Sequence, residues 1–356
     1  MATATLSIAG RVISTSQRPL IVAELSGNHN GSLERALKIV RAAAAAGADA
    51  IKLQTYTPAT LTIDSDRPEF FINDPSGPWH GRRLWELYEE AHTPWDWHAP
   101  LFAAARDEGM LCFSSAYDVS SVAFLADAKV DAIKIASFEL VHLPLIEAAA
   151  RTELPLLIST GMGTHPEIAD AVRAATSVPS PQFMLLVCTS AYPSDEDDAH
   201  LSRMHVLREH FHCPVGLSDH TIAPYTAFAA TALGAVMIEK HVTLARADGG
   251  PDAEFSLEPH ELRELVTGCD RIWRSLGHGT LKALPAEAAS MRERPSVRVV
   301  RVMKRGEVFS AENLRVVRPG NGLAPVRYHE LLGKRCARDI EEGEPMSWEL
   351  VDGVHQ

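Results

Sequence analysis

The sequence predicts an α/β protein that contains a (β/α)8 barrel followed by a second, much smaller domain. Three observations lead to this fold class. Eight short apolar runs alternate with amphipathic segments between residues 21 and 280, which is the pattern of parallel strands joined by helices. Polar residues gather at the carboxyl ends of these runs, where a barrel carries its functional side chains. After residue 296 the alternation stops, and short β-like runs with many turn residues follow.

The eight apolar runs have the length expected of buried strands. In chain order they are IVAELS (21–26), AIKLQ (50–54), LCFSSA (111–116), DAIKIAS (131–137), PLLIST (155–160), FMLLVCTS (183–190), PVGLSDH (214–220) and VMIEKHVT (236–243). Most of the segments between them have a helical pattern, such as LERALKIVRAAAAAGA and HAPLFAAARDEG. A doubly wound open sheet shows the same alternation, but eight units without a glycine-rich GxGxxG turn favour the closed barrel.

Three further segments complete the predicted organisation. Residues 5–19 precede the first strand and predict a short hairpin that closes the barrel floor. The connection over residues 55–95 is long and rich in Trp and His, which is typical either of a functional lid or of packing against the barrel rim. Residues 281–296 predict a linker. The domains expected are therefore a barrel over residues 1–280, the linker, and a small domain over residues 297–356.

Composition limits the partners and the compartment. The 356 residues carry a net charge of −12, which argues against a broad nucleic-acid or anionic-membrane surface. The five cysteines form no CxxC pair, which favours reduced thiols over a disulfide framework. The N-terminus has no basic start followed by an apolar stretch, and no run is long and apolar enough to span a membrane. We therefore expect a cytoplasmic protein.

Polar side chains end every predicted strand, which core packing alone does not explain. They are Glu24, Ser26, Lys52, Gln54, Ser114, Ser115, Lys134, Ser137, Ser159, Thr160, Ser190, Ser218, His220, Glu239 and His241. The period-two alternation of a strand places Glu239 and His241 on one inward face, where Glu239 is positioned to orient the histidine. The same alternation points Asp219 and Lys240 outward, and we interpret them as a structural ion pair.

His220 and His241 end the seventh and eighth predicted strands, which are neighbours in a barrel. Two imidazoles from adjacent strands can bind one divalent metal. A site with only two protein ligands suits a labile, mostly water-coordinated Mn²⁺ or Mg²⁺ better than a closed structural zinc. Such an open site can act as a Lewis acid on a substrate oxygen. The alternative is a pair of unrelated histidines on the rim.

Lys52 and Lys134 point into the same mouth, and buried cations that face a cavity fit a phosphate or carboxylate ligand. Serine hydroxyls would complete the cradle, namely those of Ser115, Ser137, Ser159 and Ser218. A lysine at this place could instead form a Schiff base, as in pyruvate aldolases. Aldolases that resemble sugar-acid lyases keep this lysine on the sixth strand, and the sixth run here has none.

Nine ordered motifs resemble those of the sialic acid synthase family. They are AELSGNHNGSLERAL, GADAIKLQTYTPATLT, IKIASFEL, ISTGM, CTSAYP, GLSDHT, IEKHVTL, GPDAEFSLEP and RPGNGLAP, and the resemblance extends from about residue 18 to residue 352. The small domain is similar to the antifreeze-like (SAF) domain of that family. The stretches LYEEAHTPWDWH and RADGGPDAEFSLEP resemble the pseudaminic acid synthase branch. The sequence departs from the family pattern in FSSAYD, where a Pro-Phe pair is common, and in GMG, where GMA is common. These departures concern substrate contacts.

The resemblance implies condensation of phosphoenolpyruvate with an amino-sugar aldehyde, here 2,4-diacetamido-2,4,6-trideoxy-altrose, to give pseudaminic acid and phosphate. It implies a divalent metal (Mn²⁺, Mg²⁺ or Co²⁺) at His220 and His241. It implies phosphoenolpyruvate contacts from Lys52, Ser115, Lys134, Ser137, Ser159, Ser190 and Ser218, and sugar contacts from Gln54, Tyr192, Asp252 and Arg318. Glu139 matches a proposed acid/base glutamate, and Glu24 lies at the same mouth. The resemblance also implies a homodimer with swapped C-terminal domains that complete the sites in trans.

Three other functions compete with this expectation. A synthase of the same family could use another N-acetylated hexose and make N-acetylneuraminic or legionaminic acid. A pyruvate-type lyase or another metal-dependent barrel enzyme would release no phosphate from phosphoenolpyruvate. A non-catalytic binding protein built around the SAF module would bind metal without turnover, although the full set of polar strand ends argues against it.

Overall fold

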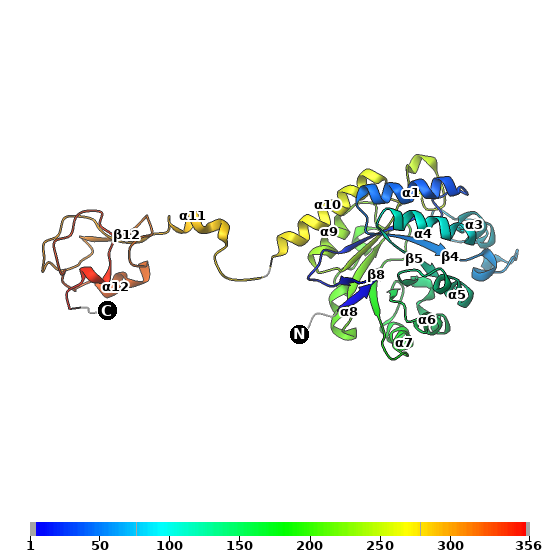
Figure 1. Ribbon diagram of the computed structural model, residues 1–356, viewed down its shortest axis with the longest axis horizontal. Helices are drawn as coiled ribbons and strands as arrows, with labels where there is room; N and C mark the ends of the chain where they lie inside the picture. Colours follow the sequence, from blue (N-terminus) through cyan, green and yellow to red (C-terminus); the bar gives the residue numbers. More distant parts are fainter. Residues whose placement is uncertain (1–4, 76, 278, 354–356) are drawn as a thin grey trace. The chain divides into compact units, whose positions relative to one another are not determined.

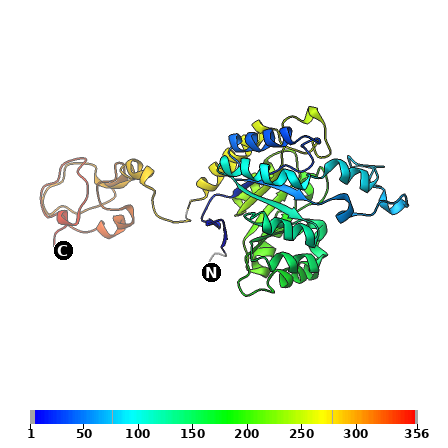
Figure 2. The same cartoon turned by 45° about the vertical axis from the view of Figure 1, so that its right-hand side comes forward.

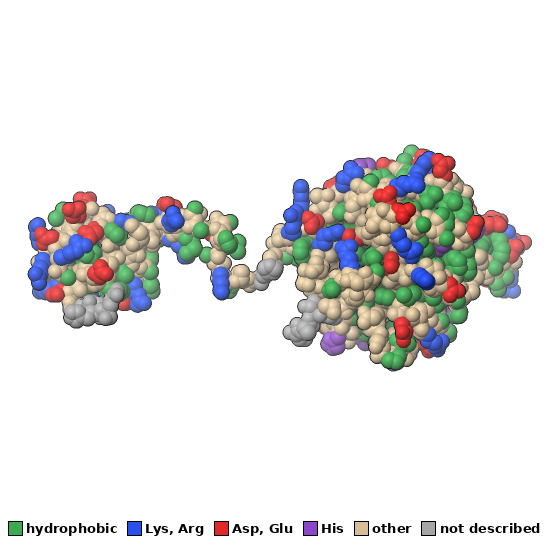
Figure 3. Space-filling view, viewed as in Figure 1, with side chains coloured by type: hydrophobic (Ala, Val, Ile, Leu, Met, Phe, Trp, Pro, Cys, Tyr) green, Lys and Arg blue, Asp and Glu red, His purple; other side chains and the backbone are tan. Residues whose placement is uncertain are grey.

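The computed structural model describes residues 5–75, 77–277 and 279–353. The chain divides into two compact units, Met1–Gly277 and His278–Gln356 (Figure 1). All five cysteines are free and buried. Within the described ranges, no helix has both the length and the apolar character needed to cross a bilayer. On the face shown in Figure 3, Lys and Arg side chains alternate with Asp and Glu rather than forming one large patch of a single sign.

The first unit contains a closed barrel of eight parallel strands, which confirms the predicted fold class. The strands are β3 (Leu20–Glu24), β4 (Ala50–Thr55), β5 (Leu111–Ala116), β6 (Ile133–Ile135), β7 (Leu156–Ser159), β8 (Phe183–Cys188), β9 (Val215–Asp219) and β10 (Met237–His241). Each strand pairs with the next along the chain, and β10 pairs with β3 to close the barrel. Every strand overlaps the run that predicted it and extends at most one residue beyond that run.

The helices that follow the strands surround the barrel in Figure 1. They are α1 (Leu33–Ala46), α4 (His98–Asp107), α5 (Val119–Asp127), α6 (Leu143–Ala150), α7 (His165–Ala175), α8 (Arg203–Phe211), α9 (Tyr225–Ala232) and α10 (Pro259–Leu276). The first of them shows why the sequence places a helix there. Ser32 caps α1 by accepting the Arg35 N–H at 3.2 Å, and Gly47 ends it in the left-handed region at φ 95°, where glycine is not strained.

The N-terminal segment forms a two-stranded hairpin from β1 (Leu6–Ile8) and β2 (Arg11–Ile13). Its buried side chains, Leu6, Ile8 and Ile13, belong to the core of the barrel unit. Arg11 forms an ion pair of 2.7 Å with Asp49, the residue immediately before β4. The hairpin is therefore held at the amino end of the strands, opposite the mouth.

The long insertion between β4 and β5 contains α2 (Pro58–Leu61) and α3 (Leu84–Ala91), and Figures 1 and 2 show it extending from the carboxyl end of β4. Its TPWDWH stretch packs into the protein rather than forming a lid. His98 is fully buried and lies 2.7 Å from the Thr55 hydroxyl. The Trp95 ring lies 4.6 Å from that of Phe124. The rim-packing interpretation therefore holds for this part of the insertion.

The second unit has its own small hydrophobic core. It contains α11 (Ala288–Met291), β11 (Ser296–Val299), β12 (Leu314–Val317) and α12 (Tyr328–Leu331), and β11 and β12 pair in antiparallel fashion. Its buried apolar residues include Val297, Met303, Phe309 and Leu331. The segment predicted as a linker carries a 3₁₀ turn, Pro285–Glu287, and the short helix α11 before β11 begins.

Candidate active site

Four charged side chains form a buried network at the carboxyl ends of β3, β4, β6 and β10. Glu239 Oε1 lies 3.4 Å from Lys52 Nζ and 3.5 Å from Lys134 Nζ. Glu24 forms an ion pair with Lys52, and the Ser218 hydroxyl donates to Glu239 at 3.0 Å. All four charged residues are at most 3% exposed. Two lysines and two carboxyl groups therefore share one water-poor site.

The pKa values of this network differ because the partners differ. Burial alone would raise the pKa of Glu239, but Lys134 and Lys52 outweigh it and hold that pKa at about 2. Burial alone would lower the pKa of Lys52, yet Glu239 and Glu24 raise it above its usual value. For Lys134 burial dominates, and its pKa is lowered although Glu239 opposes the shift. Lys134 is thus the cation with the more incomplete set of partners.

Serine hydroxyls converge beside the lysines. The Lys52 ammonium donates to Ser115 Oγ at 3.0 Å. Ser137 Oγ accepts the Gly161 N–H at 3.2 Å, and a Cβ at Gly161 would collide with the hydroxyls of both Ser137 and Ser190, so only glycine permits this approach. Ser159 Oγ is buried and has no hydrogen-bond partner among the described residues. Unsatisfied buried hydroxyls are rare, so this one indicates a site for a ligand.

The two predicted metal ligands lie side by side. The rings of His220 and His241 have centroids 5.4 Å apart. His220 Nδ1 lies 2.8 Å from the Thr189 carbonyl oxygen, which leaves Nε2 available. His241 Nδ1 is buried and forms no hydrogen bond to any residue in the described ranges. Asp252 Oδ2, at 3.8 Å, is its nearest carboxylate contact.

The donor set fits an open metal site and does not fit a closed one. Across residues 5–75, 77–277 and 279–353, no three His, Cys, Asp or Glu side chains converge as a metal-binding group. Two imidazoles with free nitrogen atoms leave the remaining positions of an ion to water or substrate, which is the arrangement of a catalytic rather than a structural site. The residues present are therefore compatible with the divalent ion that the sequence predicts.

Glu139 occupies the 3₁₀ turn Ser137–Val141 that follows β6. Its Oε2 atom is buried and lacks a hydrogen-bond partner in the part of the chain that the structure describes. Burial raises the pKa of the Glu139 carboxyl to about 7. A carboxyl with this pKa can exchange a proton near neutral pH, which is the property of a general acid or base.

The SGNHNG stretch after β3 holds the loop that follows β10. The Ser26 hydroxyl donates to Asp252 and accepts the Gln54 amide at 3.0 Å. The Asn28 side chain donates to the Val242 carbonyl at 2.9 Å, and that of Asn30 donates to the Gly249 carbonyl at 3.0 Å. The predicted sugar contacts Gln54 and Asp252 are thus brought together through Ser26, which lies 226 positions from Asp252 in the sequence.

Tyr192 and Phe255 cover the histidine pair. The Tyr192 ring lies 4.3 Å from the ring of His220, and the Phe255 ring lies 5.0 Å from that of His241. Phe255 is 1% exposed. Tyr192 was predicted from the family resemblance, whereas Phe255 was not, because a single aromatic residue in a loop carries no sequence signal of its own.

The structure corrects one detail of the prediction and confirms another. Glu239 contacts the lysines and Ser218 rather than His241, so the orienting role assigned to it is wrong and Asp252 is the carboxylate beside His241. Asp219 and Lys240 form the predicted outward ion pair, at 3.1 Å and almost fully buried.

Arg318 is the one predicted site residue outside the barrel unit. It follows β12 in the second unit and its side chain is exposed. The other predicted residues form a candidate site within the barrel unit, namely Lys52, Lys134, His220, His241, Glu24, Glu139 and the serines. Arg318 belongs to the second unit.

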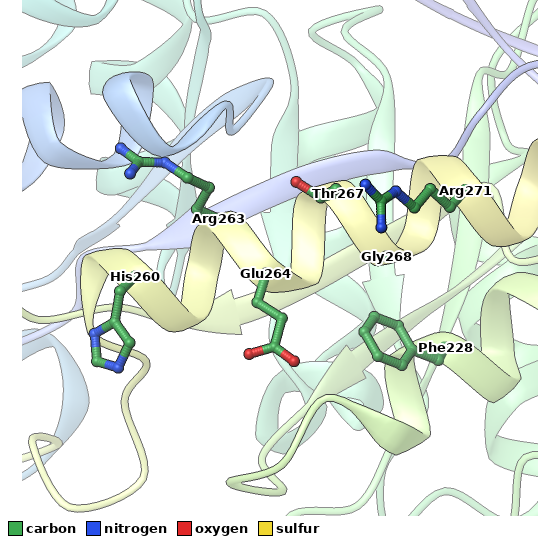
Figure 4. Close-up of a pocket in the computed structure, with 7 residues that line it drawn as sticks. All are labelled: Phe228, His260, Arg263, Glu264, Thr267, Gly268 and Arg271. Carbon is green, nitrogen blue, oxygen red and sulfur yellow. The ribbon is translucent and has the colours of Figure 1, made fainter.

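A surface depression of about 470 Å³ lies elsewhere, on the outer side of α10. Figure 4 shows Arg263, Glu264 and Arg271 projecting from this helix, with Phe228 of α9 beside Gly268. A Cβ at Gly268 would collide with the Phe228 ring, so the glycine is explained by close helix packing. None of the strand-end polar residues lines this depression.

Comparison with known proteins gives the family. The chain is 41% identical to a pseudaminic acid synthase of Campylobacter jejuni over 93% of this chain and 96% of the relative, and 39% identical to one of Helicobacter pylori over 94% and 98%. It is similar in structure to the N-acetylneuraminic acid (sialic acid) synthetase of Leptospira borgpetersenii, with a TM-score of 0.72 and 32% identity over 81% of this chain and 96% of that one. Residues 39–281 match the NeuB family and residues 294–352 match the SAF domain. The chain therefore belongs to the NeuB family and carries a C-terminal SAF domain.

Proposed function

We propose that this enzyme condenses phosphoenolpyruvate with 2,4-diacetamido-2,4,6-trideoxy-altrose to give pseudaminic acid and phosphate. The observation that carries the proposal is the buried pair Lys52 and Lys134 beside two histidines with free nitrogen atoms. This pairing suits an anionic phosphate ester and an aldehyde in one site. Similarity to pseudaminic acid synthases at 39–41% identity, compared with 32% for the sialic acid synthetase structure, favours the pseudaminic acid branch. The five free, buried cysteines agree with a cytoplasmic location.

The lysines and serines are proposed to bind phosphoenolpyruvate. Lys52 and Lys134 neutralise its phosphate and carboxylate groups, and Lys134, the cation with fewer partners, gains the most from the new charge. The free hydroxyl of Ser159 donates to the anion, together with Ser115, Ser137, Ser190 and Ser218. The gain is large because charge-assisted hydrogen bonds are stronger than neutral ones in a site that excludes water.

A divalent ion held by His220 and His241 would polarise the aldehyde oxygen of the sugar. Gln54, Tyr192 and Asp252 orient the sugar so that its aldehyde carbon faces carbon 3 of phosphoenolpyruvate. Glu24 stabilises the positive charge that develops at carbon 2 after the new carbon–carbon bond forms. Glu139 accepts a proton from the water that adds to carbon 2, and phosphate then leaves by cleavage of the carbon–oxygen bond.

A homodimer in which the SAF domain of one subunit completes the site of the other is also proposed. Apolar side chains that follow β5, β6, β7 and β9 are 47–61% exposed at the mouth end, and include Val119, Phe138, Met162 and Ile222. Exposed apolar residues also flank Arg318 in the second unit, where Val317 is 38% exposed. Exposed apolar side chains gathered at one end of a domain are typical of an interface, and Arg318 would bring a further cation to an anionic site.

A pyruvate-type lyase remains the rival from another class, because the lowered pKa of Lys134 would favour an amine nucleophile. Its expected behaviour differs sharply. Such an enzyme would consume pyruvate, release no phosphate and be trapped on Lys134 by borohydride reduction.

Substrate selectivity tests the proposal. Phosphate release from phosphoenolpyruvate should be fast with the 2,4-diacetamido sugar and at least about 10²-fold slower in kcat/KM with N-acetylmannosamine, because a buried site that pairs with the second acetamido group is left unsatisfied without it. The measurement is a coupled phosphate assay with each of the two sugars. Equal efficiency on N-acetylmannosamine would assign the chain to the sialic acid branch, and activity with pyruvate alone would assign it to the lyases.

The raised pKa of Glu139 predicts a pH dependence. If Glu139 acts as a base, kcat/KM should fall about tenfold for each pH unit below pH 7, because the carboxyl is then protonated. Glu139→Gln should remove this limb of the profile and most of the activity.

Folding stability gives the control for this prediction. The pKa of Glu139 in the folded chain, about 7, lies above the usual pKa of a glutamate, 4.5, so the folded state favours the protonated form. Ionisation then costs stability as the pH rises from about 4.5 through 7, and no cost remains at pH 4. Glu139→Gln should therefore raise the free energy of unfolding by about 1–3 kcal/mol at pH 8 and leave it unchanged at pH 4. If Glu139→Gln leaves the pH profile of kcat/KM unchanged, the proton transfer belongs to another group.

A further inference from the structure

Trp79, in the long insertion, has a side chain that contacts both the loop after β10 and the aromatic rings that cover the histidines. Its indole N–H donates to the Pro251 carbonyl at 2.7 Å. Its ring lies 5.4 Å from that of Tyr192 and 6.2 Å from that of Phe255. The hydrogen bond links residues 172 positions apart.

The hydrogen bond acts on a residue of the site. Pro251 directly precedes Asp252, which accepts from Ser26 and lies 3.8 Å from His241 Nδ1. The loop segment Gly249–Asp252 is held from one side by the side chains of Asn30 and Ser26. Trp79 holds it from the side of the insertion. Loss of the indole N–H would therefore allow Asp252 to move without disturbing the strands.

The ring acts on the shape of the site. Tyr192 and Phe255 contact the histidines directly, and Trp79 contacts both of these rings, so it lies one ring farther out from His220 and His241. The proposed reaction places the aldehyde carbon of the sugar at the histidines and toward the lysines. With the aldehyde carbon at the histidines, we take the opposite end of the six-carbon chain to lie toward the rings that cover them, of which Trp79 is the outermost. In 2,4-diacetamido-2,4,6-trideoxy-altrose that end is a methyl group.

We propose that Trp79 determines specificity for the 6-deoxy sugar: its indole N–H fixes the loop that carries Asp252, and its ring completes an apolar wall for the methyl group at carbon 6. This inference rests on the proposed function. It assigns two separable roles to one side chain, and the two roles respond to different substitutions.

Two variants separate the roles, with two sugars that differ only at carbon 6. Trp79→Phe keeps an apolar ring and removes the donor, so the KM for the sugar should rise about fivefold while the KM for phosphoenolpyruvate and the preference for the 6-deoxy sugar stay unchanged. Trp79→Ala removes both, so the preference in kcat/KM for the 6-deoxy sugar over its 6-hydroxy analogue should fall about tenfold or more, within the range for one methyl in an apolar pocket.

Trp273→Phe is the matched control. Trp273 also donates its indole N–H to a backbone carbonyl, that of Thr15 at 3.3 Å, but in α10 next to the N-terminal segment. Its substitution should alter neither the KM for the sugar nor the preference. Thermal unfolding of all three variants separates a general loss of stability from a loss of specificity, because a structural role alone would not change the ratio between the two sugars.

The outcomes are distinguishable. If wild type prefers the 6-deoxy sugar and both Trp79 variants retain that preference, the wall does not include Trp79 and the inference is wrong, while the proposed function stands. If Trp79→Phe and Trp273→Phe show the same KM values, the loop is not fixed by the indole N–H. If wild type releases no phosphate from phosphoenolpyruvate with either sugar, the proposed function itself has failed.

Discussion

Replacement of His241 by alanine is expected to reduce turnover by on the order of 10³-fold, because loss of a proposed metal ligand would remove a Lewis acid and with it several kcal/mol of transition-state stabilisation. The fold should survive this change. His241 ends β10 and its Nδ1 atom has no hydrogen bond to any described residue, so removing the ring leaves no partner group unsatisfied. Phosphate release measures turnover, electron paramagnetic resonance measures Mn²⁺ binding, and the thermal unfolding midpoint measures stability.

His98 provides the matched control. It is also a buried histidine near the barrel, but its ring contacts the Thr55 hydroxyl at 2.7 Å and the Pro94 carbonyl at 3.3 Å. His98→Ala should therefore lower the unfolding midpoint and leave Mn²⁺ binding intact, which is the reverse of the pattern for His241→Ala. Treatment of wild type with a chelator should abolish activity, and Mn²⁺, Mg²⁺ or Co²⁺ should restore it. Full activity in the chelator would remove the metal from the mechanism.

Replacement of Arg318 by alanine is expected to reduce turnover by about 10²-fold, the value of a charge-assisted hydrogen bond to a buried anion. The barrel unit and its metal binding should not change, because Arg318 is exposed in the second unit. Arg315→Ala is the control, since Arg315 is an exposed arginine in β12, the strand that Arg318 follows. Steady-state kinetics and the unfolding midpoint measure both variants.

Mixing two inactive variants, Arg318→Ala and His241→Ala, tests whether the SAF domain acts on a partner subunit. If it does, random exchange in a twofold dimer restores about a quarter of the sites, because one site of each mixed dimer contains both native residues. Each variant is labelled with a different fluorophore so that energy transfer measures the exchange. Exchange without recovery of activity would mean that each SAF domain serves its own barrel, or that Arg318 has no part in catalysis.

The barrel was predictable because its signals are local. Each strand is a short apolar run with a polar end, and period two then assigns Lys52, Lys134 and His241 to the interior. The same rule placed Asp219 and Lys240 outside, where they form their ion pair. It could not assign partners inside the mouth. Glu239 follows the rule in pointing inward, yet its partners are the lysines, because the distances between eight converging strands are set by the closed barrel and not by any one strand.

The loops were less predictable because their contacts span long distances in the sequence. TPWDWH and the stretch around Trp79 have similar compositions, but the first packs against Thr55 and Phe124 while the second reaches Pro251. Asn28 and Asn30 donate hydrogen bonds to backbone carbonyls after β10, more than 200 positions away in the sequence. No periodicity reports such pairs, so the role of these asparagines and of Phe255 became visible only in the folded chain.

The fate of one oxygen atom tests the central claim most directly. Phosphoenolpyruvate labelled with ¹⁸O at the bridging position is mixed with the 2,4-diacetamido sugar, the enzyme and Mn²⁺, and both products are analysed by mass spectrometry. Cleavage of the carbon–oxygen bond, as Lys52, Lys134 and Glu139 are proposed to promote, predicts that the ¹⁸O is recovered in phosphate, in equal amount to an unlabelled nine-carbon keto acid. Recovery of the ¹⁸O in the keto acid, or formation of the keto acid from pyruvate without phosphate, would contradict the account.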